Sequence, residues 1–396
     1  MKASTFIQLP SFARRIFIGI TLASAAIGGA AKADALDPTV NEQVVMLPVV
    51  ENGNKLQLQT TIFKPSGEGP FPLLVMNHGK DRGEPHNQNR DRFLAMSREF
   101  VKRGYAVAIP MRKGFAKSSG TYTDFGCNMT DNGQLQADSV EAVLTALVQK
   151  PWVDRERIIV AGQSYGGLAT MAFGTRQFPG VRGLLNFAGG LRIDGSSCDW
   201  KQSMTNAFAS YGARTSLPSL WFYGENDSYL DHPLAERLQQ AYQSAGGASQ
   251  LIEFGKFKND AHGMVGSRDG VAIWLPEVER FLKSLGMPSE PVVAVADTPR
   301  PAATSFAMVD NVTAVPFLSD KGRAGYRDYL NKSAPRAFAI STSGAWSWAE
   351  EGDDPSDRAL TSCQKNSSSA CKLYSVDNDV VWNTSSTSLV PPVSVN

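Results

Sequence analysis

Several features that identify whole classes of protein are absent from this sequence. Neither sign of charge is in excess, since 39 Lys and Arg residues balance 38 Asp and Glu residues in a chain of 396. The composition therefore gives no indication of nucleic acid or an anionic membrane surface as a partner. No Cys-x-x-Cys motif accompanies the four cysteines, and the chain has four histidines, which argues against a cysteine–histidine metal site. Beyond the N-terminal region no apolar run approaches the length of a membrane-spanning helix, so we expect no stable membrane insertion.

The first 33 residues have the composition of an export signal. Arg14 and Arg15 precede a weakly apolar run from Ile16 to Ala31, and the site Ala31-Lys32-Ala33 has the small residues of a cleavage site at its first and third positions. We expect cleavage after Ala33 and a periplasmic or secreted protein. The paired arginines resemble a twin-arginine leader, and the general secretion route stays equally open.

An exported chain is expected to pair its cysteines, which are Cys127, Cys198, Cys363 and Cys371. Four cysteines allow three connectivities, and all three stay open at this point. We favour Cys363 with Cys371, because that pair closes a short loop, and Cys127 with Cys198 by elimination.

Between Val44 and Leu285, strand-like apolar runs alternate with amphipathic helical stretches. This alternation predicts an α/β fold with a mostly parallel sheet covered by helices on both faces. An opening antiparallel pair is expected at Val44–Val50 and Lys55–Phe63. Buried strands are then expected at Leu73–Asn77, Tyr105–Pro110, Ile158–Gly162, Gly183–Ala188, Leu217–Tyr223 and Gln250–Phe254. The last helix, roughly Val271 to Leu285, contains Pro276 and so is expected to begin at that proline or to kink there.

The remaining chain divides by composition. Residues 34–287 are expected to form the α/β domain, and residues 288–305, rich in Pro and Ala, a linker. Residues 306–382 are expected to form a small α+β module, with strands near Phe338–Ile340 and Lys372–Val376 around a helix that starts at Asp353-Asp354-Pro355. Residues 383–396 are expected to be a disordered tail.

The stretch Gly162-Gln163-Ser164-Tyr165-Gly166 directly follows the apolar run Ile158–Ala161. Glycines on both sides of a serine allow a sharp strand-to-helix turn with the hydroxyl at its apex. The bare G-x-S-x-G pattern arises by chance about 0.3 times in such a sequence, so the flanking strand and helix must supply the specificity. The alternative is that Ser164 is an ordinary helix N-cap.

A serine hydroxyl becomes a good nucleophile when a histidine takes its proton and a carboxylate orients that histidine. Asp227 follows the expected strand that ends at Tyr223, and His262 follows the last expected strand. Such strand ends are where open α/β sheets gather their functional side chains. We therefore expect Ser164, Asp227 and His262 to act together, with Glu225 and Asp231 as alternative acids.

These strand positions, together with the chain order Ser, Asp, His, resemble the α/β-hydrolase superfamily over about Val44 to Leu285. Within it the chain resembles the dienelactone hydrolase-like esterases. The resemblance implies a serine hydrolase that cleaves a small-molecule carboxylic ester through an acyl-enzyme, with no metal or organic cofactor.

The segment Asn77-His78-Gly79-Lys80 resembles the His-Gly oxyanion segment of the same family. The resemblance implies that the backbone amides of Tyr165 and Lys80 stabilise the oxyanion that forms on the attacked carbonyl. His78 is expected to brace this loop rather than to transfer a proton.

Two other classes of function stay open. Residues 112–120 resemble the Arg-Gly-x-Gly-x-Ser segment of hydrolases that include X-prolyl peptidases and acyl esterases, so a serine exopeptidase or aminoacyl amidase is one alternative. A non-catalytic binding protein on a hydrolase fold is the other. Residues 307–382 resemble a small accessory module of some exported hydrolases, which implies no chemistry and no known partner.

Overall fold

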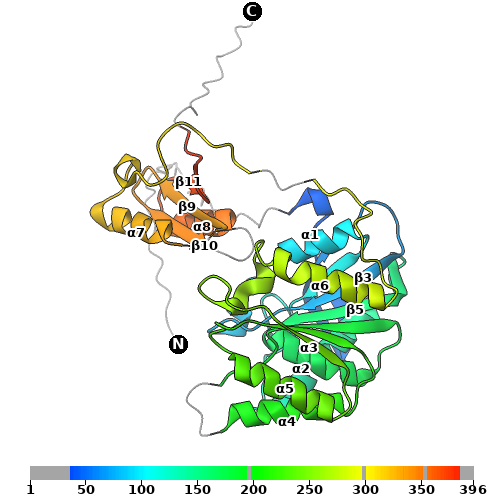
Figure 1. The fold of residues 1–396 in the computed structure, drawn as a ribbon. Coiled ribbons are helices and arrows are strands. Elements are labelled where there is room, and N and C mark those ends of the chain that lie inside the picture. Colours follow the sequence, from blue (N-terminus) through cyan, green and yellow to red (C-terminus); the bar gives the residue numbers. More distant parts are fainter. Residues whose placement is uncertain (1–35, 194–197, 297–299, 333, 351–354, 384–396) are drawn as a thin grey trace, which may run out of the picture. The chain divides into compact units, whose positions relative to one another are not determined.

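The structure is a computed structural model, and it describes residues 36–193, 198–296, 300–332, 334–350 and 355–383 (Figure 1). The predicted export signal lies outside the described residues, as does the predicted tail apart from Asn383. The same holds for Asp353 and Asp354 of the predicted helix start. In the described ranges no helix is long and apolar enough to cross a membrane.

One large sheet organises the first part of the described chain. Its strand order is β1–β2–β4–β3–β5–β6–β7–β8. The strands are β1 (Gln43–Glu51), β2 (Asn54–Phe63), β3 (Phe71–Asn77), β4 (Ala106–Pro110), β5 (Val153–Gln163), β6 (Val181–Phe187), β7 (Ser219–Tyr223) and β8 (Ser249–Glu253). β2 pairs antiparallel with both β1 and β4, whereas the other neighbouring strands run parallel. The carboxyl ends of β3 to β8 therefore meet at one edge of the sheet.

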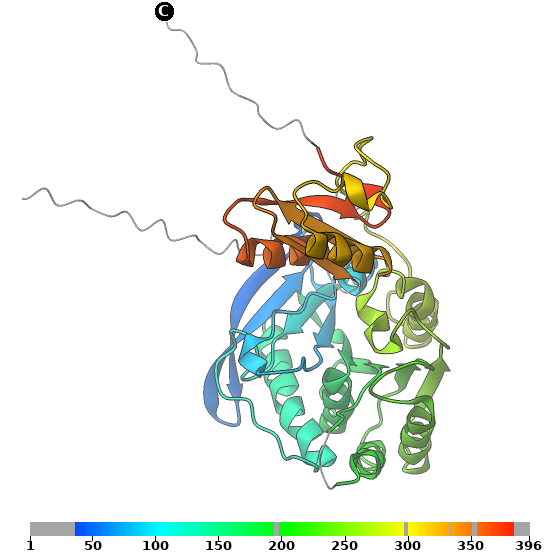
Figure 2. The same cartoon turned by 90° about the vertical axis from the view of Figure 1, so that its left-hand side faces the viewer.

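Helices cover both faces of this sheet (Figure 1 and, turned by 90°, Figure 2). One face carries α1 (Leu94–Lys102) and α6 (Val271–Ser284). The other carries α2 (Met129–Leu147), α3 (Tyr165–Phe173), α4 (Trp200–Gly212) and α5 (His232–Ser244). Along β5, Ile158 and Val160 belong to the core under α2 and α3, whereas Ile159 and Ala161 belong to the core under α1 and α6. A strand buried on both faces has a continuous run of apolar residues, and this run allows the strand to be predicted from the sequence.

The predicted fold class is confirmed, with differences at the ends of elements. β5 begins at Val153 rather than at Ile158, because residues 154–157 are polar and carry no apolar signal. α6 begins at Val271, close to the expected bounds, and Pro276 lies inside it. Of the two expected alternatives the helix therefore does not begin at the proline, and a kink there stays a prediction. The described residues also contain five short 3-10 helices, namely η1 (Pro38–Val40), η2 (Pro85–Asn87), η3 (Gly174–Arg176), η4 (Ala261–Gly266) and η5 (Val312–Ala314).

The segment predicted as a linker hydrogen-bonds to α1 over part of its length. The N–H groups of Val292 and Val293 both donate to the carbonyl of Lys102, at 2.8 and 2.9 Å. The Arg103 side chain donates to the Ser289 carbonyl at 3.0 Å. The domain boundaries on either side of this segment stay predictions.

The described residues after 300 contain a small module with its own antiparallel sheet, in the order β10–β9–β11–β12. Its elements are α7 (Asp320–Leu330), β9 (Arg336–Ser341), β10 (Trp346–Glu350), α8 (Pro355–Lys365), β11 (Cys371–Val376) and β12 (Asp379–Val380). On β9, Phe338 and Ile340 pack in a core with the aromatic rings of α7, whereas Ala337 and Ala339 pack with α8. The predicted α+β module is therefore confirmed.

Both favoured disulfides are present in the structure. Cys127 pairs with Cys198, across 71 residues of sequence, and Cys363 pairs with Cys371, across 8. The first joins the residue before the α2 N-cap to the loop that precedes α4. Two disulfides are typical of proteins from oxidising compartments.

Candidate active site

Ser164 forms the sharp turn between β5 and α3. Its φ of 55° and ψ of −125° put a residue with a side chain in a conformation that L-residues rarely adopt. The backbone is held on both sides, because Ser164 N–H donates to Phe187 O and Ser164 O accepts from Gly190 N–H, each at 3.0 Å. The Ser164 side chain makes no capping hydrogen bond to α3. The helix-cap alternative is therefore not what the structure shows.

The glycines around Ser164 are required by close packing of three backbone segments. A Cβ atom on Gly162 would lie 2.1 Å from the carbonyl oxygen of Gly166. A Cβ atom on Gly166 would lie 2.1 Å from the carbonyl oxygen of Asn77 at the end of β3. A methyl group cannot approach an oxygen so closely. Only glycine at these positions therefore lets three backbone segments pack together here, namely the end of β5, the start of α3 and the end of β3.

Asp227 and His262 are brought together at the same edge of the sheet. His262 Nδ1 lies 2.9 Å from Asp227 Oδ2 and 3.1 Å from Oδ1. The Asp227 side chain is fully buried, and its Oδ1 also accepts the N–H groups of Tyr229 and Leu230 at 2.8 and 2.9 Å. An ionised carboxylate can only accept, so Nδ1 carries the proton and Nε2 has a free lone pair. A base with that tautomer is able to take a proton at Nε2.

The two alternative acids are engaged elsewhere. Glu225 pairs with Lys256 at 3.4 Å. Asp231 caps α5 by accepting Leu234 N–H at 3.2 Å, as expected for a residue before a helix that opens with His-Pro. Neither carboxylate orients His262.

The loop that carries His262 is fastened to its surroundings by two side chains that sequence reasoning missed. Asp260 accepts the backbone N–H of His262 at 2.9 Å and the hydroxyl of Ser228 at 2.5 Å. Gln163, directly before Ser164, donates to the carbonyl oxygen of His262 at 3.1 Å. The His262 loop is thus tied both to the loop of Asp227 and to the turn of Ser164. An aspartate directly before a turn is a local signal that could have identified Asp260, which is the N-cap of η4.

The ring of Tyr229 lies beside the imidazole of His262, with 4.6 Å between the two ring centroids. In the part of the chain that the structure describes, no hydrogen bond joins the Ser164 hydroxyl to the His262 ring. Such bonds are often long in free enzymes and tighten when substrate binds.

The segment after β3 passes directly over the serine turn. A Cβ atom on Gly79 would lie 2.7 Å from Gln163 Oε1 and 3.3 Å from Ser164 Cβ. Lys80, the next residue, therefore places its backbone amide close to Ser164. Tyr165 is the first residue of α3, and the first N–H groups of a helix have no acceptor within that helix. The arrangement offers two amides near one hydroxyl.

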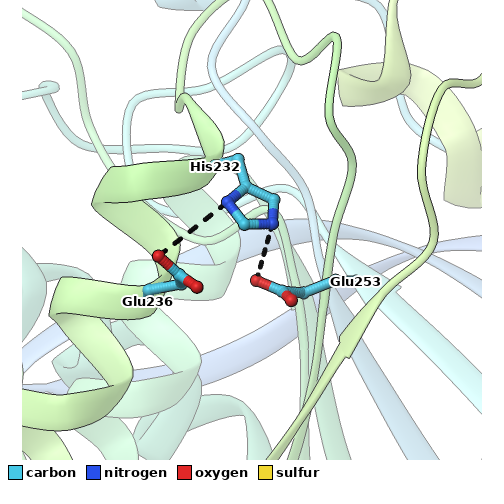
Figure 3. A group of neighbouring side chains, drawn as sticks. All are labelled: His232, Glu236 and Glu253. Carbon is cyan, nitrogen blue, oxygen red and sulfur yellow. Dashed lines mark ion pairs between the residues drawn. The ribbon is translucent and has the colours of Figure 1, made fainter.

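Three side chains of metal-ligating types gather away from this site, on α5 and at the end of β8. Figure 3 shows the imidazole of His232 between the carboxylates of Glu236 and Glu253. His232 Nδ1 lies 4.0 Å from Glu236, and Nε2 lies 2.9 Å from Glu253. The carboxylates face opposite nitrogens of one ring, which is the arrangement of a surface ion-pair network. His232 is a half-buried residue at the start of α5.

Comparison with known proteins gives a match to a family model for part of the chain. Residues 53–193 match the X-Pro dipeptidyl-peptidase (S15 family) model. The matched region includes His78, Arg112 and Ser164, and it ends before Asp227 and His262.

A curated relative from Bacillus subtilis (strain 168), described as the uncharacterized peptidase YuxL, is 25% identical over 264 residues. The alignment covers 60% of this chain and 38% of the relative, so the chain spans well under half of that protein's length. Among solved structures, Pyrococcus horikoshii acylaminoacyl peptidase aligns at 18% identity over 64% of this chain and 43% of its own, with a TM-score of 0.46. A Pyrococcus furiosus esterase aligns at 14% identity over 62% of this chain and 91% of its own, with a TM-score of 0.44.

The order of the strands and the serine turn define the fold. A mostly parallel sheet whose second strand is antiparallel, with the third and fourth strands exchanged in the order, carries a strained serine at the exit of β5. The family-model match covers the same strand–turn–helix unit. The described strands therefore form an α/β-hydrolase fold, and residues 53–193 match the X-Pro dipeptidyl-peptidase (S15 family) model.

Proposed function

We propose that the protein is a serine hydrolase that cleaves a carboxylic ester of a small or medium-sized substrate through an acyl-enzyme. One observation carries the proposal. His262, paired with the buried carboxylate of Asp227, is fastened through Gln163 to the turn that presents Ser164. Such a pairing of acid, base and exposed hydroxyl is what nucleophilic catalysis by serine requires.

In the proposed reaction Ser164 Oγ attacks the carbonyl carbon while its proton passes to His262 Nε2. Asp227 keeps the ring in the required tautomer and stabilises the imidazolium that forms. The amides of Tyr165 and Lys80 donate to the oxyanion. His262 then gives the proton to the leaving alcohol, which departs and leaves the acyl group on Ser164. Water attacks the acyl-enzyme by the same steps and releases the carboxylic acid and free serine.

An ester is favoured over an amide for two reasons. An alcohol leaves the tetrahedral intermediate more readily than an amine does, so the groups described above suffice. An exopeptidase also needs a carboxylate for the free amino terminus of its substrate, and the carboxylates that contact His262 are already engaged. Asp227 holds the ring, while Asp260 holds Ser228 and the His262 backbone.

A serine exopeptidase or aminoacyl amidase is the second candidate. The match to the S15 family model and the curated peptidase relative favour it. It uses the same three side chains and differs in the leaving group.

The test is a comparison of kcat/KM for 4-nitrophenyl esters and for aminoacyl and prolyl 4-nitroanilides, with Ser164→Ala as the control. We expect the esters to exceed the anilides by more than about 100-fold and the variant to lose both activities. Faster anilide hydrolysis would replace the ester proposal by the peptidase. Absence of turnover on every substrate would favour a binding protein.

We also propose that the protein is exported. The two disulfides support an oxidising compartment. N-terminal sequencing of protein recovered from the periplasm or medium tests this, with Asp34 as the expected first residue. Recovery from the cytoplasm with the N-terminus intact would contradict it.

A further inference from the structure

Two buried side chains outside the proposed triad lie against the oxyanion loop. His78 and Arg112 are both fully buried, and neither has a role in the proton transfers described above. Two hydrogen bonds join them. Arg112 N–H donates to His78 Nε2 at 3.0 Å, and Arg112 Nη1 donates to the carbonyl oxygen of His78 at 2.7 Å.

The hydrogen bonds define the state of the His78 ring. Because Nε2 accepts a backbone N–H, it carries no proton, and the single proton of the neutral ring is on Nδ1. Burial, together with the neighbouring Arg112 charge, lowers the pKa of His78 well below 6.5, so the ring stays neutral. Nδ1–H therefore donates to the carbonyl oxygen of Gly79, which lies 2.6 Å away.

This bond sets the direction of the next amide. In a planar trans peptide the C=O and N–H groups point to opposite sides. With Gly79 O held toward the His78 ring, the N–H of Lys80 is directed away from it. Gly79 itself lies over Ser164.

The neighbouring amide is already in use. Gln88 Oε1 accepts Asp81 N–H at 3.0 Å, and Gln88 Nε2 donates to Gly79 O at 3.4 Å. In the described ranges, Lys80 N–H has no acceptor. Lys80, rather than Asp81, is thus the amide of this loop that is free to meet a substrate oxygen.

Arg112 is in turn held by a residue of α2. Its Nε donates to Gln136 Oε1 at 2.7 Å. The guanidinium packs over the rings of Phe115 and Tyr165, at 5.4 and 5.7 Å from their centroids. The hydrogen bonds from Arg112 to Gln136 and to His78 join buried groups, and such bonds are costly to break because water cannot replace them.

We propose that His78 and Arg112 are positioning residues for the reaction: the chain Gln136–Arg112–His78–Gly79 O fixes the peptide that presents Lys80 N–H to the oxyanion. This inference rests on the proposed serine hydrolase function. It assigns the first residue of the Arg-Gly-x-Gly-x-Ser-like segment to the orientation of the oxyanion loop. Substrate contacts are made by the loop and not by Arg112.

The test compares His78→Phe with His78→Gln. Phenylalanine fills the ring site beside Phe115, whose ring lies 4.7 Å from that of His78, and removes both ring hydrogen bonds. We expect kcat for a 4-nitrophenyl ester to fall about 100-fold with KM within about 2-fold, because the lost interaction exists only in the transition state. The affinity for a trifluoromethyl ketone, which forms an oxyanion on Ser164, should fall by the same factor. Glutamine can both donate and accept, so His78→Gln should recover about 10-fold of the loss.

Arg103→Met is the matched control for loss of a buried polar group, since Arg103 pairs with Glu99 and Glu279 in α1 and α6 on the other face of the sheet. It should lower the melting temperature and leave kcat and ketone affinity unchanged. A folded His78→Phe protein with kcat and ketone affinity within about 3-fold of wild type would overturn the proposal. If that variant does not fold, Gln136→Leu decides in the same assays, and unchanged kcat and affinity there overturn it. Failure of the proposed serine hydrolase function would give a different result, because turnover by the wild-type protein would then not depend on Ser164.

Discussion

The carboxylate of Asp227 lies 2.9 Å from Nδ1 of His262, although 35 residues separate them in the chain. The two residues follow neighbouring strands, β7 and β8, and meet because parallel strands end at one edge of the sheet. Two backbone amides, from Tyr229 and Leu230, fix one oxygen of the carboxylate. The other oxygen is left to orient the histidine.

Asp227→Asn should reduce kcat by about 1,000- to 10,000-fold with little change in KM. The backbone amides of Tyr229 and Leu230 need an acceptor, so they will hold the amide oxygen of the new side chain. Its NH2 group then faces Nδ1 of His262 and forces the proton to Nε2, where the lone pair is needed. Steady-state kinetics on an aryl ester measure the loss. An Asp227→Asn protein with more than about a tenth of wild-type kcat would show that another acid orients the base.

Gly166→Ala should destabilise the fold by about 3 kcal/mol or more, because the added methyl group would meet backbone atoms of Asn77 that cannot move independently. Gly266→Ala is the control, since a Cβ atom there meets open space. Urea denaturation followed by tryptophan fluorescence gives both values. Equal stabilities of the two variants would mean that the serine turn is less closely packed than described.

His78 should make stability depend on pH. Its folded pKa lies well below 6.5 because of burial, so between the two values the unfolded chain binds a proton that the folded chain does not. The contribution of neutral His78 to the free energy of unfolding is therefore fully present above pH 6.5. It is lost on acidification from pH 6.5 down to the folded pKa, by up to about 1.4 kcal/mol per pH unit. Denaturation at pH 7.5, 6.5 and 5.5 should show a smaller fall for His78→Gln. Parallel pH profiles for the two proteins would contradict a neutral buried His78.

Removal of the Cys127–Cys198 disulfide should cost more stability than removal of Cys363–Cys371. By chain entropy, bonds that close loops spanning 71 and 8 residues contribute about 4 and about 2.5 kcal/mol. Alanine pairs at each disulfide, compared by thermal unfolding, test the order. A larger effect of the Cys363–Cys371 pair would show that strain or residual structure dominates over loop length.

The sequence allowed most of the large sheet to be predicted, because strands buried on both faces appear as apolar runs. The same runs allowed Ser164, Asp227 and His262 to be placed at strand ends. Their order along the chain matched that of the family the sequence resembles, and this match distinguished the three residues from others of the same types. In the C-terminal module, β10 was missed since its residues Trp346 to Glu350 are mostly half-buried and alternate weakly. α7 was missed as well.

The polar support of the site could not be predicted from local patterns. Arg112 reaches His78 across 34 residues and Gln136 across 24, so only the folded chain shows these partners. Gln163 likewise reaches His262 across 99 residues. Hydrogen bonds between distant side chains leave no periodic signal, whereas a cap such as Asp231 does, because its acceptor and donor are neighbours in sequence.

Active-site labelling shows whether Ser164 is the nucleophile. Purified protein is treated with a fluorophosphonate probe, and the modified peptide is identified by mass spectrometry. We expect one label per chain on Ser164, lost in Ser164→Ala and slowed by about 1,000-fold or more in His262→Ala. A folded protein that takes up no probe, or a label on another residue that survives Ser164→Ala, would contradict it.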